Sequence, residues 1–236
     1  MDKAARIRYS RQIALPQIGK EGQERLLNSR VLIVGCGALG SMVAMQLAGA
    51  GVGVIGIADF DNIDISNLQR QFFYTTEEIG LPKTSILERH IKALNPEIKV
   101  VPYNEMLTVK KCKVIFQEYD FIVDATDNPE SKRMIGTVAK EAGKPCCIGG
   151  IQNFSGQVMT LLPSSSRFEE FFGNASSEGV LPCSLGGVFA PAAAICASIQ
   201  ASETLKYLTQ SGNLLTGQLL SFNLLTNSFR KFRDEV

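Results

Sequence analysis

The stretch that decides the fold is 30–40, Arg30-Val31-Leu32-Ile33-Val34-Gly35-Cys36-Gly37-Ala38-Leu39-Gly40. The first five residues form an apolar, partly β-branched run that is typical of a buried strand, and the apolar residues from Met42 to Ala50 suit a packed helix. A second apolar run, 54–58, ends at Asp59, nineteen residues after the last glycine of the turn. Strand, glycine turn, helix and strand together predict a βαβ crossover with a nucleotide-type loop.

The same alternation of strand and helix continues to about residue 150. It predicts a Rossmann-like α/β fold in which a doubly wound sheet is mainly parallel. Proline punctuates the longest helix of this region, since Pro82 opens it and Asn95-Pro96 ends it. The expected elements are a helix over 82–94, strands over 98–101 and 121–123, a helix over 129–142 and a strand over 145–148.

The pattern changes after Gly150, where we expect a mixed or antiparallel extension of the same sheet. No linker divides the chain, so we predict one domain over 1–236, with a nucleotide-binding half over 1–150 and a second half over 151–236. A polar segment at about 164–185 is long enough to suggest a functional loop. The expected elements are strands over 157–162, 218–222 and 228–232 and a helix over about 189–208.

The composition excludes several classes of protein. Lys plus Arg (24) nearly cancel Asp plus Glu (23), so no global basic field indicates a nucleic-acid partner. The first thirty residues lack an apolar signal segment, and the longest weakly polar run, 188–199, is too short to cross a bilayer. Six cysteines without regular spacing fit reduced thiols. We therefore expect a cytoplasmic protein with no membrane or nucleic-acid partner.

The glycine turn provides the first candidate binding residues. A glycine loop brings backbone N–H groups close to a phosphate at a helix N-terminus, which is the role expected of Gly35, Gly37 and Gly40. The carboxylate of Asp59, at the end of the second strand, can accept hydrogen bonds from ribose hydroxyls. These residues alone fit an NAD site equally well, or a tight packing turn.

The next segment distinguishes an NAD site from a site for another nucleotide. It is 59–71, Asp59-Phe60-Asp61-Asn62-Ile63-Asp64-Ile65-Ser66-Asn67-Leu68-Gln69-Arg70-Gln71. An NAD site does not need so many cationic and amide side chains. A site in which a triphosphate is attacked at its α-phosphorus does need them. Arg70 and Lys83 can neutralise charge on the phosphoryl oxygens, although either alone would be interpreted as a solvated surface charge. The remaining candidates are Asp61 for the cofactor, Asn67 for the phosphates, and Asp127 at a strand end for Mg²⁺.

At these residues the sequence resembles the MoeB/ThiF family, the bacterial relatives of ubiquitin-activating enzymes, over nearly the whole chain. The string 66–71 is the most specific part of the resemblance. The other matching segments are 8–12, the glycine loop, the rest of 59–71, Gly80-Leu81-Pro82-Lys83, Thr126-Asp127-Asn128, and Pro182-Cys183 through Ala190-Pro191.

The resemblance implies an ATP-dependent adenylyltransferase. The implied enzyme is a homodimer that adenylates the terminal glycine of a ubiquitin-like sulfur carrier ending in Gly-Gly and releases pyrophosphate. It uses its second half, with the crossover loop at about 164–185, for carrier binding and dimer contacts. Its implied site residues are Asp59 for the ribose, Asn67, Arg70 and Lys83 for the phosphates, and Asp127 for magnesium.

Two more residues receive a role only through the resemblance. Arg11 is implied to reach across the dimer into the site of the other subunit, as an arginine finger does. Cys183 stands where family members place a cysteine able to bond covalently to the carrier, although adenylation itself needs no cysteine.

The sequence departs from the family in two respects. It contains no CxxC pair, whereas many relatives hold a structural zinc with two such pairs, so we predict no structural zinc. Phe168, Phe171 and Phe172 are the expected apolar replacements that tie the loop down. The sequence also ends at Val236 without a rhodanese-type domain, so we expect a separate sulfur donor protein.

Three alternatives remain open at this point. An NAD-linked oxidoreductase would explain the glycine loop and Asp59 but not Arg70, Lys83 or Asp127. A non-catalytic subunit of an activating enzyme would be expected to lack the phosphate-handling residues. A related enzyme could activate another carboxylate, either a small molecule or an RNA-borne threonylcarbamoyl group. The sequence does not choose between thiamine, molybdopterin, cysteine or another thio-compound as the product of the pathway.

Overall fold

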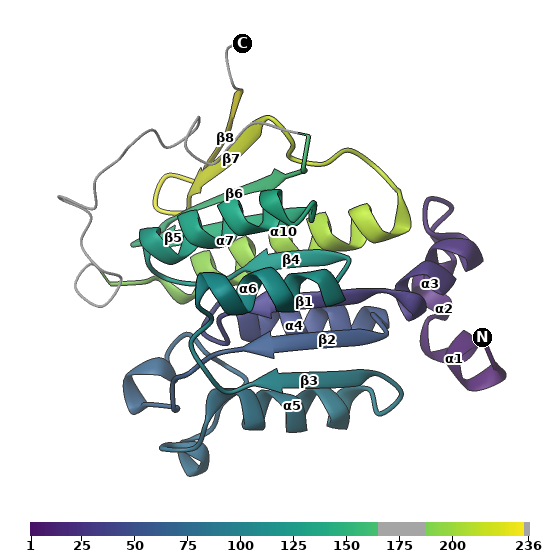
Figure 1. Cartoon of the computed structure of the whole chain (residues 1–236), viewed down its shortest axis with the longest axis horizontal. Coiled ribbons are helices and arrows are strands. Elements are labelled where there is room, and N and C mark those ends of the chain that lie inside the picture. The colour runs from purple at the N-terminus through teal and green to yellow at the C-terminus, as the bar shows by residue number, and fades with distance from the viewer. Residues whose placement is uncertain (165–186, 234–236) are drawn as a thin grey trace.

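A computed structural model describes residues 1–164 and 187–233 of the chain. Their central element is one eight-stranded sheet with the order β3-β2-β1-β4-β5-β6-β7-β8 (Figure 1). The strands are β1 (Arg30–Val34), β2 (Val54–Ala58), β3 (Lys99–Tyr103), β4 (Phe121–Asp124), β5 (Cys146–Gln152), β6 (Ser155–Leu161), β7 (Gln218–Asn223) and β8 (Ser228–Arg233).

The sheet changes direction at one place. Strands β1 to β5 pair in parallel, whereas β5, β6, β7 and β8 pair antiparallel. The change occurs at the short connection 153–154 between β5 and β6, where Asn153 adopts a positive φ of 53°. The predicted α/β fold with its mainly parallel sheet and antiparallel C-terminal extension is therefore confirmed.

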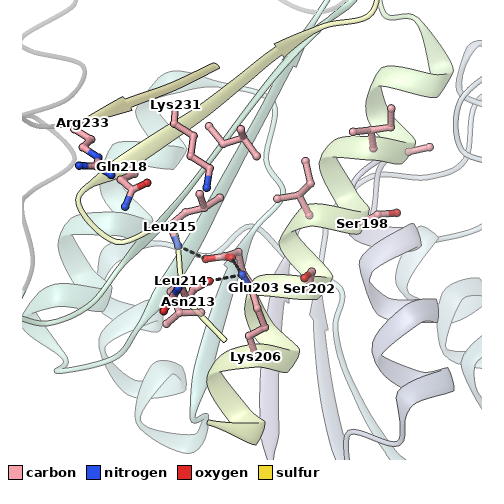
Figure 2. Close-up of a pocket in the computed structure, with 14 residues that line it drawn as sticks. Ser198, Ser202, Glu203, Lys206, Asn213, Leu214, Leu215, Gln218, Lys231 and Arg233 are labelled. Carbon is pink, nitrogen blue, oxygen red and sulfur yellow. Dashed lines mark hydrogen bonds and ion pairs between the residues drawn. The ribbon is translucent and has the colours of Figure 1, made fainter. Parts of the chain in front are cut away.

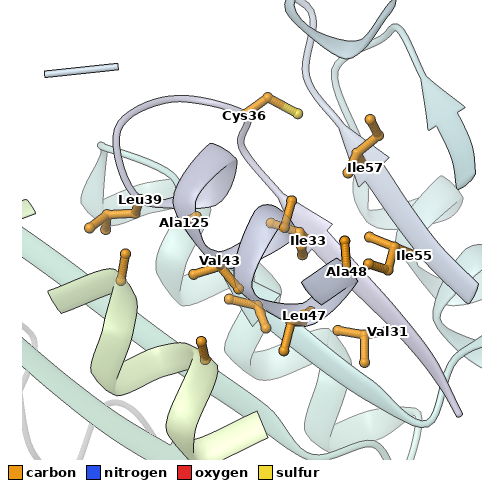
Figure 3. Packing of buried hydrophobic residues seen from close by; sticks show 14 of the residues in the cluster. Val31, Ile33, Cys36, Leu39, Val43, Leu47, Ala48, Ile55, Ile57 and Ala125 are labelled. Atoms are coloured by element: carbon orange, nitrogen blue, oxygen red, sulfur yellow. The ribbon is translucent and has the colours of Figure 1, made fainter. Parts of the chain in front are cut away.

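Helices cover both faces of the parallel part of the sheet (Figure 1). On one face, α6 and α7 share a buried core with Leu32 and Val34 of β1; on the other, α4 packs over Val31 and Ile33 (Figure 3), and α5 and α10 contribute to the same core. This alternation of sides along one strand explains why a continuous apolar run is needed there. The helices are α4 (Gly40–Ala50), α5 (Lys83–Leu94), α6 (Val109–Ile115), α7 (Pro129–Glu141) and α10 (Ala190–Thr209).

The N-terminal helices lie at the edge where the parallel strands begin (Figure 1). The ring of Tyr9 lies against Gly51, just after α4, and its hydroxyl accepts a hydrogen bond from Asn95 at 2.8 Å. These helices are α1 (Lys3–Arg8), α2 (Ser10–Ile13) and α3 (Gly19–Asn28). The edge where the strands end, which carries the glycine loop, is at the opposite side of the sheet.

Most predicted strands and helices are confirmed to within a few residues. The bounds of β1 and β2 agree with prediction, whereas β5 extends beyond 148 to Gln152 because Gly149 and Gly150 continue the pairing with β6. Helix α5 begins at Lys83, since Pro82 is extended and lies just outside it. No helix among the described residues is long and apolar enough to span a membrane.

Candidate active site

A cavity of about 910 Å³ lies where the parallel strands end, between the glycine loop, the segment after β2, the start of α7 and the surface of β5 and β6. Most of the predicted site residues line it: Gly35, Gly37, Asp59, Asp61, Asn67, Arg70, Lys83 and Asp127. These residues come from segments far apart in the sequence, so their meeting is a result of the fold. The carboxyl ends of a parallel sheet are the usual place for ligands in this architecture.

The three loop glycines are required for different reasons. Gly35 has a φ of +98°, and a Cβ there would lie 2.6 Å from the carbonyl oxygen of Ala125. A Cβ on Gly40 would lie 1.7 Å from the carbonyl oxygen of Gly35. Gly37 meets only the amide of Gln71, at an unstrained 3.6 Å, and faces the cavity. Packing therefore explains Gly35 and Gly40, whereas Gly37 leaves space for a ligand in the cavity.

Asp59 fastens the glycine loop to the segment after β2. Its Oδ2 accepts the Cys36 backbone N–H at 2.6 Å, and its Oδ1 accepts the Asp61 N–H at 2.9 Å. Burial raises the pKa of this carboxyl group above its ordinary value, and the nearby charge of Lys83 opposes that rise. The side chain is thus held rigidly at the cavity wall, where further lone pairs of a carboxylate can accept from a ligand.

Lys83 and Asp61 form an ion pair at the cavity wall. The Lys83 side chain is only 6% exposed and its Nζ lies 2.8 Å from Asp61 Oδ2, whereas Asp61 is 49% exposed. Asp61, expected to bind the cofactor, is here the counter-ion of a buried lysine at the first turn of α5. The pair leaves Lys83 two further N–H donors with which to meet an anion.

Local hydrogen bonds orient Asn67 and Arg70 around the 3-10 turn Ile65–Asn67. The Asn67 Oδ1 accepts the Asp64 backbone N–H at 3.2 Å, which leaves the Nδ2 donors of Asn67 for a ligand. The Arg70 Nη1 donates to the carbonyl oxygen of Ser66 at 2.9 Å. Both side chains line the cavity, so an amide donor and a guanidinium stand beside the glycine loop.

Asp127 lies in the turn between β4 and α7. Its side chain is exposed and lines the cavity. The next residue, Asn128, caps α7 by accepting the Ser131 N–H at 2.8 Å. The Asp127 carboxylate takes part in no hydrogen bond or ion pair within the described part of the chain, which suits a ligand role better than a structural one.

Sequence reasoning missed two polar groups of this cavity. Gln71 is 4% exposed and its Oε1 has no hydrogen-bond partner among the described residues, an arrangement that a ligand or a water must relieve. Lys132 points from α7 to the end of β4, where its Nζ lies 3.1 Å from the buried Asp124 Oδ2. The sequence does contain a pattern that could have indicated Lys132: the apolar run 121–124 ends in the carboxylate of Asp124, and Lys132 follows eight residues later on the next predicted helix.

Two predicted residues do not line the cavity, and one is not described. Gly40 begins α4 behind the loop. Arg11 is exposed on α2, among the helices at the opposite edge of the sheet, so one chain does not bring it to its own cavity. Cys183 lies outside the described residues, as do Phe168, Phe171 and Phe172 and nearly all of the predicted loop 164–185.

The five described cysteines are all buried. Burial raises the pKa of the Cys112 thiol to about 11 and that of Cys196 to about 12. Cys146 and Cys147 pack on opposite faces of the sheet, because they are adjacent in one strand. Within 1–164 and 187–233 no group of three or more Cys, His, Asp or Glu side chains is arranged to hold a metal. The expectation of no structural zinc stays a prediction.

A second cavity, of about 680 Å³, lies between α10, β7, β8 and the segment 213–215 (Figure 2). Its central charge is Glu203, only 1% exposed, whose Oε2 accepts from Thr160 Oγ1 at 2.6 Å and from the Leu215 N–H at 2.7 Å. Glu203 also pairs with Lys206, which donates to the carbonyl oxygen of Asn213 at 2.6 Å. None of the predicted site residues lines this cavity.

Comparisons with known proteins agree with this geometry. A profile described as the ThiF family matches residues 9–235, nearly the whole chain. The chain belongs to the ThiF family.

Two curated relatives of this ThiF-family chain are adenylyltransferases by name. It is 39% identical to a "Sulfur carrier protein adenylyltransferase" of Thermus thermophilus over 95% of the chain and 85% of that protein. It is 40% identical to a "Probable molybdopterin-synthase adenylyltransferase" of Porphyra purpurea over 96% of the chain but only 60% of that protein. A crystal structure of E. coli MccB with succinimide shares the fold, with a TM-score of 0.85 at 22% identity, over 96% of the chain and 71% of MccB.

Proposed function

We propose that this ThiF-family protein adenylates the C-terminal glycine of a ubiquitin-like sulfur carrier that ends in Gly-Gly, with ATP as the donor. One observation carries the proposal: Asn67, Arg70, Lys83 and Asp127 meet the glycine loop at a single cavity. The names of the relatives support the sulfur carrier as the substrate. An NAD site would not explain why two cations, one amide and one exposed carboxylate line the same cavity.

The arrangement fits an attack of a carboxylate on the α-phosphorus of ATP. The carboxylate oxygen forms a bond to phosphorus, the bond to the pyrophosphate oxygen breaks, and an acyl adenylate and pyrophosphate result. The nucleophile is already an anion, so no general base is required, and catalysis rests on positioning and charge stabilisation. Lys83 and Arg70 stabilise negative charge on the phosphoryl oxygens, Asn67 donates from Nδ2, and Asp59 accepts from the ribose hydroxyls.

Asp127 is the residue we assign to magnesium. Mg²⁺ in nucleotide sites is usually held by one or two carboxylates together with phosphate oxygens and water, and an exposed carboxylate on the cavity wall fits that donor set. When bound, the ion would neutralise charge on the phosphates. Asp127 would hold that ion in the same cavity that Lys83 lines.

The far part of the same cavity has room for the tail of the carrier. It runs from the glycine loop across β5, β6 and β7, where its wall includes Ile148, Met159 and Leu219. Gly150, which also lines it, leaves the strand surface without a side chain at that position, since the nearest atom to a Cβ there would be Lys132 Cε at 3.9 Å. A Gly-Gly terminus is narrow enough to lie extended over such a surface, which explains a preference for a tail without side chains.

Several further features belong to the same proposal. Arg11 acts in the cavity of a second copy, so the enzyme works as a homodimer; the support is the position of α2, which carries Arg11, at the edge where the parallel strands begin. Residues 1–236 act as one adenylation domain, with nucleotide binding in 1–150 and carrier and dimer contacts in 151–236. The protein is cytoplasmic, lacks structural zinc, and depends on a separate sulfur donor, and Cys183 is the candidate for a covalent carrier adduct.

ATP–pyrophosphate exchange tests the proposal. The purified chain is incubated with ATP, Mg²⁺ and a sulfur-carrier protein that ends in Gly-Gly, and with the same carrier lacking its final glycine. We expect exchange only with the complete carrier, and loss of about a hundredfold or more of it in Asp127→Asn. Glu130→Gln, three residues further along the same cavity wall, is the matched control and should retain exchange. Tight NAD binding, or undiminished exchange in Asp127→Asn, would overturn the proposal.

A further inference from the structure

Lys132 is a cation of the cavity wall whose donors are all engaged within the protein. Its side chain is 14% exposed. Its Nζ lies 2.5 Å from the carbonyl oxygen of Thr126, 2.5 Å from that of Gly149 and 3.1 Å from Asp124 Oδ2. An ammonium has three N–H donors, so each has a partner and none is left for a phosphate. In this respect Lys132 differs from Lys83, whose Nζ donates among the described residues to the carboxylate of Asp61.

The charge of Lys132 is balanced at the end of β4. The Asp124 carboxylate is fully buried, and its Oδ1 accepts both the N–H of Thr126, at 3.1 Å, and the Thr126 hydroxyl, at 2.6 Å. A buried carboxylate is tolerated when such contacts satisfy its oxygens. Asp124 and Lys132 thus form a satisfied pair at the cavity wall, with no N–H donor of Lys132 left for a ligand.

The contacts converge on the residue that precedes Asp127. Thr126 is held by its N–H and its hydroxyl through Asp124, and by its carbonyl oxygen through Lys132. The bond from Lys132 to the Gly149 carbonyl oxygen ties this turn to β5, the neighbouring strand. Asp127 follows directly, and its side chain reaches the cavity from a backbone fixed on both sides, by Thr126 and by the Asn128 cap of α7.

We propose that Lys132 is a positioning residue for Asp127: it clamps the ends of β4 and β5 together and so fixes where the magnesium-binding carboxylate points. The inference rests on the proposed function, in which Asp127 serves the metal. Outer contacts of this kind change metal affinity by about 10- to 100-fold when removed, without touching the metal.

Manganese binding measured by electron paramagnetic resonance tests the assignment apart from activity. The full chain is titrated with Mn²⁺ in the presence of the non-hydrolysable nucleotide α,β-methylene-ATP. We expect Lys132→Met to weaken Mn²⁺ binding by about tenfold or more. The matched control is Lys144→Met, because Lys144 is partly exposed, does not line the cavity, and donates from Nζ to the carbonyl oxygen of Gln117 at 3.2 Å.

A double-mutant cycle separates positioning from direct binding. If Lys132 acts through Asp127, Lys132→Met should change Mn²⁺ binding by less than about twofold when Asp127 is already Ala. An equal loss with and without Asp127, or a loss of nucleotide affinity in EDTA as large as that of Lys83→Met, would overturn the assignment and make Lys132 a phosphate ligand.

A folding defect is controlled by a second variant. Because Lys132→Met leaves Asp124 buried without its cation, the pair Asp124→Asn with Lys132→Met is made alongside it, and both are checked by thermal unfolding. The pair still lacks the donor to Thr126 and Gly149, so it should weaken Mn²⁺ binding as the single variant does; binding equal to wild type would contradict the inference. Exchange by the wild-type chain is measured in parallel, since its absence would defeat the proposed function, whereas normal Mn²⁺ binding by Lys132→Met defeats only the positioning role.

Discussion

The two cavities of this protein differ in how completely the protein satisfies their polar groups. In the cavity beside α10, the buried Glu203 is satisfied by a hydroxyl, a backbone N–H and Lys206. In the cavity at the glycine loop, the buried Gln71 has an acceptor without a partner among the described residues, and the exposed Asp127 lines the same cavity as Arg70 and Lys83. Satisfied groups hold a fold together, whereas groups left incomplete by the protein indicate a ligand. The size of a cavity alone would not separate the two.

The largest effect that would follow from this difference is expected at Lys83. Lys83→Met removes a cation that meets developing charge on the phosphates, so we expect ATP–pyrophosphate exchange to fall by about a hundredfold to a thousandfold. Its counterpart is Lys206→Met in the second cavity, which should leave the exchange rate of the folded enzyme unchanged. Equal losses in both variants would show that the two cavities do not differ in this way.

The reverse effect is expected at Glu203. Glu203→Gln replaces a buried carboxylate that accepts two hydrogen bonds and pairs with Lys206, so it should lower the free energy of unfolding by about 2 kcal/mol. For a chain of this length that corresponds to a Tm lower by about 4–8 °C. Thermal unfolding by circular dichroism measures it, with exchange assayed well below the Tm. If the variant is as stable as the wild type, Glu203 does not stabilise the fold.

A smaller effect distinguishes the glycines of the loop. Gly37→Ala meets no atom closer than 3.6 Å and needs no positive φ, so the chain should fold with a nearly unchanged Tm. The new methyl group enters the cavity, and we expect ATP to bind about tenfold more weakly by calorimetry. Gly40→Ala, with its Cβ 1.7 Å from a backbone oxygen, should instead impair folding. Unchanged ATP affinity in Gly37→Ala would place the nucleotide elsewhere.

The smallest effect concerns acid stability near the start of α5. Burial opposes ionisation of Glu78, but the Thr75 N–H, His90 and Arg89 outweigh it and lower the pKa of this carboxyl group. The folded pKa thus lies below the unfolded value of about 4.3, so the stabilisation is complete above that value and is lost as the pH falls through the folded pKa. Glu78→Gln should make stability less dependent on pH below about pH 4.5. Urea unfolding at a series of pH values would show it, and identical pH profiles for both proteins would refute it.

The fold was predictable because its signals are local. Buried strands such as 30–34 and 54–58 are continuous apolar runs, and proline or glycine marks most helix ends. The antiparallel extension followed from the change of pattern after Gly150. The end of β5 was not predicted because Gly149 and Gly150 carry no pattern, and only the pairing with β6 shows that the strand continues.

The site was predictable as a set of residues but not as a set of contacts. The segment 59–71 names most of its members, yet the pairing of Asp61 with Lys83 depends on how α5 docks beside the strand ends. The contact between Asp124 and Lys132 likewise needs the position of α7. The roles of Arg11 and Cys183 were predicted only from the family resemblance. Arg11 does not line the cavity of its own chain, and Cys183 lies outside the described residues.

The most direct test of the central claim is the mass of the carrier after reaction. A sulfur-carrier protein ending in Gly-Gly is incubated with this chain, ATP and Mg²⁺, quenched in acid, and measured by intact-protein mass spectrometry. We expect a carrier that has gained one adenylyl group at its terminal carboxylate with the wild-type enzyme but not with Lys83→Met or Asp127→Asn. A carrier of unchanged mass while ATP is consumed, or an adenylyl group that forms equally with Asp127→Asn, would contradict it.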